Sequence, residues 1–342
     1  MKQKVLVTGG AGYIGSHTCV ELIEAGYEVI VADNLSNSSE DSLDGVEKIT
    51  GVRPSFEKLD LCDKDKVFDL FRKYPGIEAI IHFAALKAVG ESVQIPLAYY
   101  HNNLESLINL LLAMSEFGEP GLVFSSSCTV YGQPDVLPVT EKAPIKKAES
   151  PYGNTKQICE EIIQDALKAN NKLSSIALRY FNPIGAHKSA HIGELPLGVP
   201  QNLVPFVTQT AAGIREQLSV FGNDYDTPDG SAIRDYINVT DLAKAHVKAV
   251  ERLIEKKSKH SFEVFNLGTG TGLSVLEIVN AFEKATGVKL NYKIVGRREG
   301  DIVKVWAETT HANEVLGWKA EVPLEETLLS AWEWEKRIRN ID

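Results

Sequence analysis

Short apolar runs alternate with longer helical patterns through the first half of the chain, and this alternation constrains the fold more than any other sequence feature. The first apolar run, at 5–8, is followed by a helical pattern at 14–25. Strands that alternate with helices of this length form βαβ units around a parallel sheet. We therefore predict an α/β fold with a doubly wound parallel sheet. Further strands are predicted at 28–32, 79–83, 122–125 and 175–179, and further helices include 66–73, 104–116 and 151–169.

The sequence changes character after about residue 183, where proline and glycine become frequent. The chain has 342 residues, about twice the length of a typical single domain. We predict a first domain over 1–182 and a second, smaller, substrate-binding domain mainly over 183–342. Strand patterns at 234–238 and 262–266 indicate that 233–266 returns to the first domain.

Three glycines lie between the first predicted strand and the first predicted helix. Gly9 permits a tight turn, Gly12 lets backbone approach a pyrophosphate, and Gly15 lets the helix pack closely. The helix N-terminus offers N–H groups to the phosphates. Asp33 ends the next strand, where a carboxylate accepts hydrogen bonds from ribose hydroxyls and repels a 2′-phosphate. The motif predicts a Rossmann-type domain that binds NAD rather than NADP, although Asp33 alone could also serve as a cap.

Other predicted strand ends line the same crevice. Asp60 follows the third strand, and Lys87 lies in the segment after the fourth, where it either faces the cofactor or is a surface lysine. Asn102 opens a long helix and is either a cofactor ligand or a capping or core amide. The predicted cofactor-binding residues are Gly9, Gly12, Tyr13, Ile14, Gly15, Asp33, Asn34, Asn37, Ser38, Asp60, Leu61, Phe83, Ala84, Ala85, Lys87, Asn102, Ser125, Tyr152, Lys156, Tyr180 and Phe181.

A tyrosine and a lysine lie four residues apart at the start of a predicted helix. Ser150 suits the N-cap and Pro151 the first helical position, which places Tyr152 and Lys156 on one helix face. A cation beside a phenol favours the phenolate, so we expect the pKa of Tyr152 to fall toward neutrality. The phenolate can then remove a hydroxyl proton while hydride leaves the same carbon. Ser127, at the end of the preceding strand, is the predicted third catalytic residue because its hydroxyl can bond the reacting oxygen.

The overall charge argues against a nucleic-acid partner. The formal net charge is −10, whereas proteins that grip phosphate backbones usually carry a basic surface. The four cysteines form no CxxC pair, and the N-terminus shows no signal-peptide pattern. No apolar stretch is long enough to cross a bilayer. We expect a cytoplasmic protein without a membrane partner or a bound metal.

Together these motifs resemble the extended short-chain dehydrogenase/reductase family, and further segments resemble its UDP-hexose 4-epimerases. The segments that carry this resemblance are 83–92, 125–132, 179–185, 221–236 and 297–301. They cover nearly the whole chain in the right order, and three lie outside the cofactor domain. The resemblance implies an NAD-dependent enzyme that inverts C4 of UDP-galactose or UDP-glucose through a 4-keto intermediate, and that often forms homodimers.

The resemblance also implies the residues that bind the substrate. In addition to Ser127 and Tyr152 they are Asn182, Asn202, Leu203, Phe221, Arg234, Arg298, Asp301 and Val305. Phe221 is expected near the uracil, the two arginines on the diphosphate, and Asp301 on the uridine ribose. At the position of Val305, family members restricted to glucose and galactose can carry tyrosine. We therefore hypothesise that UDP-N-acetylglucosamine and UDP-N-acetylgalactosamine are also interconverted.

Three alternatives remain at this point. A nucleotide-sugar 4,6-dehydratase usually carries an Asp-Glu pair after the strand-end Ser or Thr, whereas here Cys128 and Thr129 follow Ser127. A simple NAD-linked oxidoreductase would release reduced cofactor. A catalytically silent NAD-binding protein would not need the Ser127, Tyr152 and Lys156 set.

Overall fold

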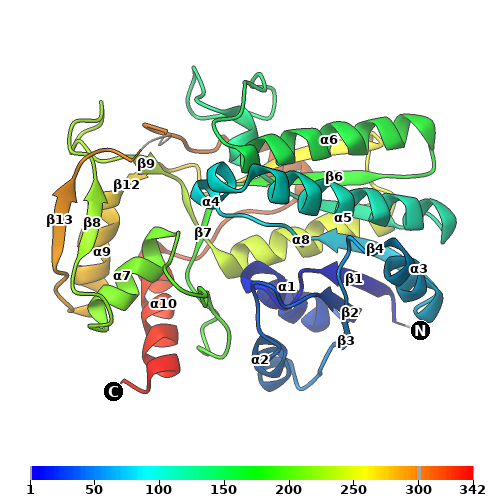
Figure 1. Cartoon of the computed structure of the whole chain (residues 1–342), viewed down its shortest axis with the longest axis horizontal. Helices are drawn as coiled ribbons and strands as arrows, with labels where there is room; N and C mark the ends of the chain where they lie inside the picture. Colours follow the sequence, from blue (N-terminus) through cyan, green and yellow to red (C-terminus); the bar gives the residue numbers. More distant parts are fainter. Residues whose placement is uncertain (1, 299–301, 342) are drawn as a thin grey trace.

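Seven parallel strands form the central sheet of the computed structural model, which describes residues 2–298 and 302–341 (Figure 1). The sheet order is β11-β6-β5-β4-β1-β2-β3, and every neighbouring pair is parallel. This order confirms the predicted Rossmann-type α/β fold. The strands are β1 (Lys4–Thr8), β2 (Glu28–Asp33), β3 (Ser55–Lys58), β4 (Ile77–His82), β5 (Gly121–Ser127), β6 (Ser175–Tyr180) and β11 (Phe262–Leu267).

Helices cover both faces of this sheet (Figure 1). One face carries α1 (Tyr13–Glu24), α2 (Asp41–Thr50) and α8 (Val239–Ile254), and the other carries α3 (Lys64–Lys73), α5 (Pro96–Glu116) and α6 (Pro151–Ala169). The short α4 (Val89–Gln94) precedes α5, and the 3-10 turn η1 (Cys128–Tyr131) follows β5. The π-helical turn η2 (Ala312–Leu316) packs beside α8 and β11.

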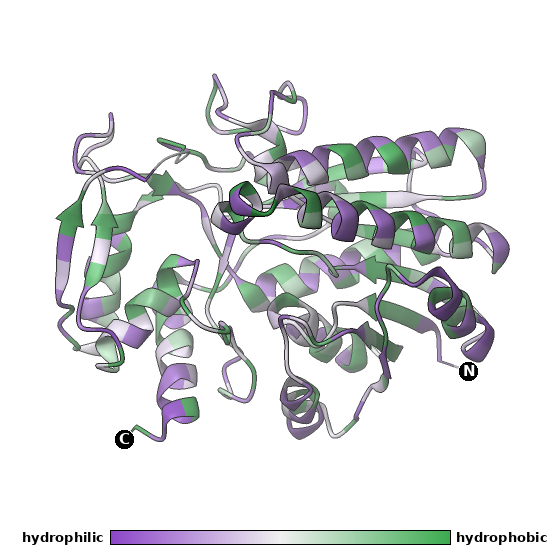
Figure 2. Ribbon diagram, viewed as in Figure 1, coloured by the Kyte–Doolittle hydropathy of each residue, from purple (hydrophilic) through white to green (hydrophobic). Residues whose placement is uncertain are grey.

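The strands are apolar on both faces because both faces are covered. In β1, Val5 and Val7 belong to the core beneath α1 and α8, whereas Leu6 belongs to the core beneath α5 and α6. The same alternation recurs in β2, β4 and β5, so each strand serves two cores at once. Figure 2 shows this as hydrophobic colour along the strands and hydrophilic colour on the outer sides of the helices.

A smaller lobe lies at one end of the sheet, on the left of Figure 1. Its two-stranded sheet pairs β8 with β13, and its own core includes Val220, Phe282 and Trp332. The elements of the lobe are α7 (Leu203–Ala211), β8 (Leu218–Phe221), α9 (Val275–Thr286), β13 (Tyr292–Val295) and α10 (Leu324–Arg339).

Short strands connect the lobe to the central sheet. Residues 234–238 are divided between β9 (Ile233–Arg234), which pairs with β12 (Leu273–Ser274), and β10 (Tyr236–Asn238), which pairs with β7 (Asn182–Ile184). Neither pairs with the central sheet, whereas β11 does join it beside β6. The break between β9 and β10 falls at Asp235, whose buried carboxylate accepts backbone N–H groups of Thr269, Gly270 and Ala307. The proposed domain boundary at residue 182 stays a prediction.

Candidate active site

The glycine turn between β1 and α1 has no room for side chains. Gly9 has φ +70°, and a Cβ there would lie 2.7 Å from the backbone nitrogen of Ala84. A Cβ on Gly15 would overlap the carbonyl oxygen of Gly9, so this glycine lets α1 pack against the turn itself. Gly12 is the N-cap of α1, and no side chain caps the helix there. The first N–H groups of α1 are therefore not occupied by a cap, which suits an anionic group such as a pyrophosphate.

Asp33 holds this turn in place from the end of β2. Its Oδ2 accepts the N–H of Ala11 at 3.1 Å, and its Oδ1 accepts the N–H of Leu35 and the hydroxyl of Ser38, both at 2.9 Å. Three donors therefore fix the orientation of a largely buried carboxylate. A carboxylate has about four lone-pair sites. One site remains for a ribose hydroxyl, so capping and ribose binding are compatible roles.

The segment after β4 approaches the glycine turn. Phe83 donates its N–H to the carbonyl of Thr8, and its ring packs 4.7 Å from that of His246. The half-exposed Lys87 forms an ion pair of 3.4 Å with Glu194, a residue of the smaller lobe's connecting loop. Asp60 is exposed at the end of β3, where it accepts the N–H of Cys62. Lys87 therefore has one ion-pair partner, and its contact with the cofactor stays a prediction.

The buried amide of this region is Asn103 rather than Asn102. Asn103 pairs with both the N–H and the carbonyl of Leu86, and it donates to the hydroxyl of Thr155 at 3.1 Å. It thereby ties the segment after β4 to the catalytic helix α6. The side chain of Asn102 donates only to the neighbouring Asn103 amide. Sequence reasoning missed Asn103, although an asparagine at an apolar position of a long helix is a usable signal.

The first turns of α6 carry the predicted catalytic pair. Ser150 caps the helix by accepting the N–H of Gly153, and Pro151 occupies the first turn, as predicted. Lys156 is buried, and its Nζ donates to the carbonyl of Ser125 on β5 at 2.6 Å. Ser127 lies close enough to the phenol of Tyr152 to act on its pKa, and its hydroxyl accepts the N–H of Thr129. The structure thus brings Tyr152, Lys156 and Ser127 together at the carboxyl end of β5.

The expectation that Lys156 lowers the pKa of Tyr152 is wrong. Burial raises the pKa of the Tyr152 phenol well above its usual range, and the hydrogen bond from Ser127 offsets only part of this rise. The Lys156 ammonium lies 5.9 Å from the centre of the tyrosine ring and donates a hydrogen bond to the backbone carbonyl of Ser125 instead. Burial is a property of the folded protein, so helical spacing alone could not reveal it.

Burial also lowers the pKa of Lys156 to about 8, because a buried ammonium loses hydration. The lysine is therefore charged below that pH and neutral above it. We expect kcat/KM to fall as the pH rises through about 8, if the ammonium positions the reacting groups. A pH profile of kcat/KM checks this, with Lys156→Arg as the comparison because arginine stays charged. The same alkaline fall in Lys156→Arg would contradict the assignment to Lys156.

A buried ion pair lies below the catalytic pair on the same helix. Glu160 forms a two-pronged pair with Arg179 of β6, at 2.9 and 2.5 Å, and accepts the hydroxyl of Ser126. Arg179 continues to Tyr131, which donates to Asn266 on β11. The pair to Glu160 raises the pKa of Arg179 despite its burial. This network joins α6 to β5, β6 and β11, and sequence reasoning did not predict it.

Apart from Ser127 and Tyr152, the predicted substrate residues that the structure describes come from the smaller lobe and from the strands and loops that connect it to the central sheet. Arg298 places its guanidinium 5.7 Å from the ring of Phe221, and Phe221 is 41% exposed at the end of β8. Arg234 ends β9 and acts electrostatically on Cys128, which follows Ser127. Asn202 is the N-cap of α7, which begins at Leu203. Asn182 begins β7, and Asp301 lies outside the described residues.

Val305 is only 2% exposed and belongs to a small apolar cluster with Val130, Tyr131 and Phe181. Its backbone N–H donates to the carbonyl of Ile233, beside Arg234. Packed neighbours therefore fill the space around this side chain.

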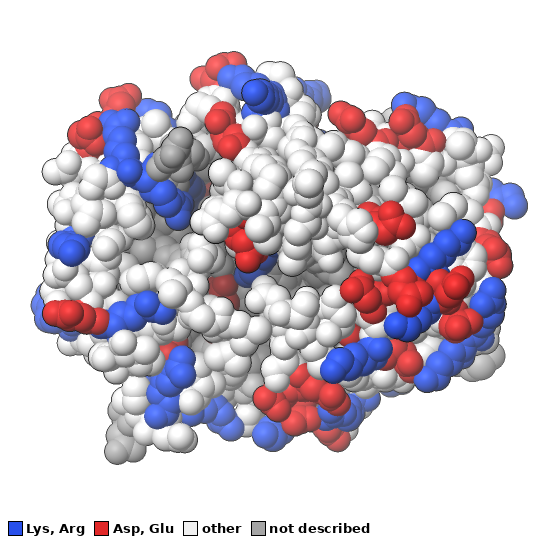
Figure 3. All heavy atoms as spheres, in the orientation of Figure 1, with Lys and Arg blue, Asp and Glu red and all other residues white. Residues whose placement is uncertain are grey.

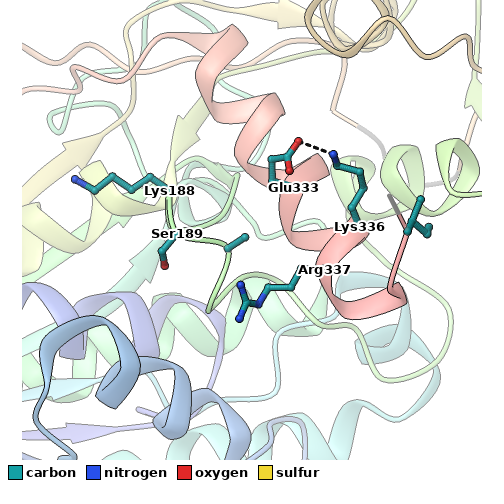
Figure 4. Close-up of a pocket in the computed structure, with 7 residues that line it drawn as sticks. Lys188, Ser189, Glu333, Lys336 and Arg337 are labelled. Carbon is teal, nitrogen blue, oxygen red and sulfur yellow. Dashed lines mark ion pairs between the residues drawn. The ribbon is translucent and has the colours of Figure 1, made fainter.

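A cavity of about 320 Å³ opens elsewhere, between the loop after β7 and the C-terminal half of α10 (Figure 4). It contains none of the predicted site residues. In Figure 4 the side chain of Lys188 extends away from Arg337, and Lys336 pairs with Glu333. The cations around this cavity do not converge on one point, so the cavity is not the centre of the chemistry.

Glycine turn, strand-end carboxylate and the Ser–Tyr–Lys set together define an NAD-binding protein of the extended short-chain dehydrogenase/reductase class. Residues 6–330 match the sequence model of the family described as GDP-mannose 4,6 dehydratase. The chain is 53% identical to UDP-glucose 4-epimerase of Bacillus subtilis, over 97% of this chain and 96% of that protein. It is 51% identical to the human UDP-glucose 4-epimerase, over 98% and 97% of the two chains.

Solved structures give the same result. The UDP-glucose 4-epimerase of Bifidobacterium longum, solved in complex with NAD+ and UDP, superposes with a TM-score of 0.95. That structure is 45% identical and the match covers 99% of this chain and 100% of the other. The chain belongs to the UDP-glucose 4-epimerase family.

Proposed function

We propose that this protein is an NAD-dependent epimerase that interconverts UDP-galactose and UDP-glucose by inverting C4 of the hexose. The observation that carries the proposal is the meeting of Ser127, Tyr152 and Lys156 at the carboxyl end of β5, which is the same end of the parallel sheet as the glycine turn after β1. The 45–53% identity to UDP-glucose 4-epimerases over nearly the whole chain supports the same reaction.

Oxidised NAD, which the glycine turn and Asp33 would hold, would supply a hydride acceptor and a positive charge that favours the phenolate of Tyr152. Tyr152 removes the proton of the C4 hydroxyl, and Ser127 holds the same sugar oxygen by a hydrogen bond. Loss of this proton together with the C4 hydride, which the cofactor would accept, leaves a ketone at C4. The ketone can then present its other face, where the hydride would return to C4 while Tyr152 gives the proton back to the oxygen, and the product is the inverted alcohol. Lys156 donates a hydrogen bond to the carbonyl of Ser125, which keeps its positive charge near Tyr152.

Inversion requires a firm hold on the nucleotide and a loose hold on the sugar. Arg234 and Arg298 are suited to the diphosphate because a guanidinium binds phosphate oxygens in a two-pronged manner. Phe221 offers an exposed ring for the uracil. We assign the binding of the substrate's nucleotide to these three residues, together with Asn182, Asn202, Leu203 and Asp301.

The dehydratase alternative is not favoured, although the matching sequence model carries a dehydratase description. Elimination of water needs an added acid and base near the sugar C5 and C6. Cys128 and Thr129 occupy the positions after Ser127, and burial raises the pKa of the Cys128 thiol to about 12. A thiol with so high a pKa is not a suitable base near neutral pH.

A direct assay tests the proposal. The purified protein is incubated with UDP-galactose, and UDP-glucose is quantified by chromatography with no added NAD. Conversion to an equilibrium mixture without net reduced cofactor supports an epimerase. A 4-keto-6-deoxy product, or steady accumulation of reduced cofactor in solution, would refute it.

The second substrate class depends on Val305. We expect wild-type protein to convert UDP-N-acetylgalactosamine as well, and Val305→Tyr to abolish this activity while the UDP-galactose activity remains. Because Val305 is buried among packed neighbours, the added phenol would have to push them toward the sugar site and would leave less room there for the N-acetyl group. Val139→Tyr is the control for simple overpacking, since Val139 is buried in the same apolar cluster. A parallel fall of both activities in Val305→Tyr would remove the specificity role.

We also propose a homodimer, formed through the outer face of α5. Leu107, Leu110, Leu111 and Met114 pack inside the chain, whereas Ile108 and Leu112, one turn apart, are 38% and 45% exposed. Ile108→Glu with Leu112→Glu is expected to convert a dimer into a monomer in light scattering. Val136→Glu, at an exposed loop position, is the control and should leave the mass unchanged. A monomeric wild-type protein would disprove the dimer.

We place the protein in the cytoplasm, and four free cysteines support this placement. No helix in residues 2–298 and 302–341 is long and apolar enough to span a bilayer. Figure 3 shows acidic and basic side chains interspersed over the face that it draws, without a continuous basic patch.

A further inference from the structure

One carboxylate oxygen joins a cofactor-side residue to a substrate-side residue. Oε1 of Glu194 accepts the Nδ2 of Asn202 at 2.6 Å and pairs with the Nζ of Lys87 at 3.4 Å. Lys87 follows β4 in the NAD-binding half, and Asn202 caps α7 in the smaller lobe. Glu194 was not among the residues expected from the sequence, because its two partners lie at distant or loop positions.

The surroundings of Glu194 fix its position. Its side chain is only 10% exposed. Its backbone carbonyl accepts the indole N–H of Trp334 at 2.9 Å, and the preceding Gly193 lies against the Trp334 ring. The carboxylate also acts electrostatically on Tyr13 of the glycine turn. A nearly buried carboxylate needs compensating donors, and Lys87 and Asn202 provide them.

The two bonds determine how both partners face a ligand. The amide nitrogen of Asn202 is committed to Glu194, which turns the amide oxygen away from the carboxylate. The ammonium of Lys87 is held at one of its three N–H groups, and two remain for an anionic group. We propose that Glu194 is a positioning residue that orients Lys87 toward the cofactor and Asn202 toward the nucleotide of the substrate. This inference rests on the ligand assignments made above for Lys87 and Asn202.

Two substitutions of Glu194 distinguish its interaction with Asn202 from its interaction with Lys87. The carbonyl oxygen of Gln in Glu194→Gln can still accept from Asn202, but it has no charge to hold Lys87. Glu194→Ala loses both the hydrogen bond from Asn202 and the ion pair with Lys87. We expect Glu194→Ala to weaken UDP binding to the NAD-loaded protein about tenfold, the effect of losing one charge-assisted hydrogen bond. Glu194→Gln is expected to keep UDP affinity within about threefold while losing NAD faster on dialysis.

Calorimetry with UDP and the absorbance of released NAD are the two readouts, and neither requires turnover. Glu57→Gln is the matched control, because Oε1 of Glu57 also accepts from a lysine and a second donor, at 2.6 Å each, far along the sheet at β3. It should change neither readout. Absence of UDP binding in the wild-type protein would refute the proposed function itself, and this outcome is distinct from any effect at Glu194.

A double-mutant cycle tests whether Glu194 acts through Asn202. Asn202→Ala should weaken UDP binding about tenfold in the wild-type background but less than about twofold in Glu194→Ala, since the amide is no longer oriented there. Equal losses in both backgrounds would overturn the positioning role, as would unchanged UDP affinity and NAD retention in Glu194→Ala. A lower melting temperature together with equal losses would identify Glu194 as a structural residue only.

Discussion

Tyr152→Phe is expected to lower kcat about 10²- to 10⁴-fold, the usual contribution of a general acid–base group. In the proposed mechanism the phenol takes and returns the C4 proton, and Ser127 cannot replace it because an unassisted hydroxyl is a weak base. The ring itself remains, so packing in the first turn of α6 should be preserved. Bound NAD should also remain, because the glycine turn and Asp33 do not depend on the phenolic oxygen.

Initial rates with UDP-galactose and the NAD content of the purified variant check this prediction. Tyr74→Phe is the control: its hydroxyl also forms a hydrogen bond, to Glu57, but it lies at the far side of the sheet. Full activity in Tyr152→Phe would refute the catalytic role. Loss of NAD together with activity would show that the substitution disturbed the cofactor site instead.

Glu160→Ala is expected to destabilise the protein by about 3–5 kcal/mol, the cost of leaving a buried charge without its partner. Arg179 and Glu160 have side chains only 7% and 5% exposed, so water cannot readily replace the lost carboxylate. The free energy of unfolding from urea titrations measures the change. If the alanine variant does not fold, Glu160→Gln keeps one acceptor for Arg179 and gives a smaller loss of stability.

The neighbouring Glu161→Ala is the matched control, because Glu161 is exposed on the same helix. Surface substitutions of this kind usually change stability by less than about 0.5 kcal/mol. Equal stability of the Glu160 and Glu161 variants would mean that the buried pair contributes nothing beyond helix propensity.

Local patterns predicted the central sheet because each strand and helix of a βαβ unit carries its own signal. The helix at 151–169 was predicted with its observed bounds, since Ser150 and Pro151 mark its start. The positions of Tyr152 and Lys156 followed from the same signals. Strand β11 joined the sheet as predicted, whereas residues 234–238 did not, because Asp235 is held by backbone donors of two distant loops.

Long-range contacts explain what the sequence did not reveal. Glu160 contacts Arg179, and Glu194 contacts Lys87. Asn103 contacts Leu86 and Thr155. Each contact joins two different elements that are distant in the sequence. No periodicity marks such pairs in a single sequence. The pKa of Tyr152 was predicted in the wrong direction for the same reason, since burial depends on the whole fold.

The turns at the amino ends of the strands, opposite the candidate site, have room for added groups. Gly26, Gly76 and Gly118 lie in turns that lead into β2, β4 and β5, and each has open space around it. The glycine turn, Asp33, Ser127, Tyr152 and Lys156, which form the candidate site, lie instead near the carboxyl ends of the strands. Affinity tags, fluorescent labels or surface anchors placed in these turns would therefore leave catalysis undisturbed. The enzyme can be immobilised through these turns.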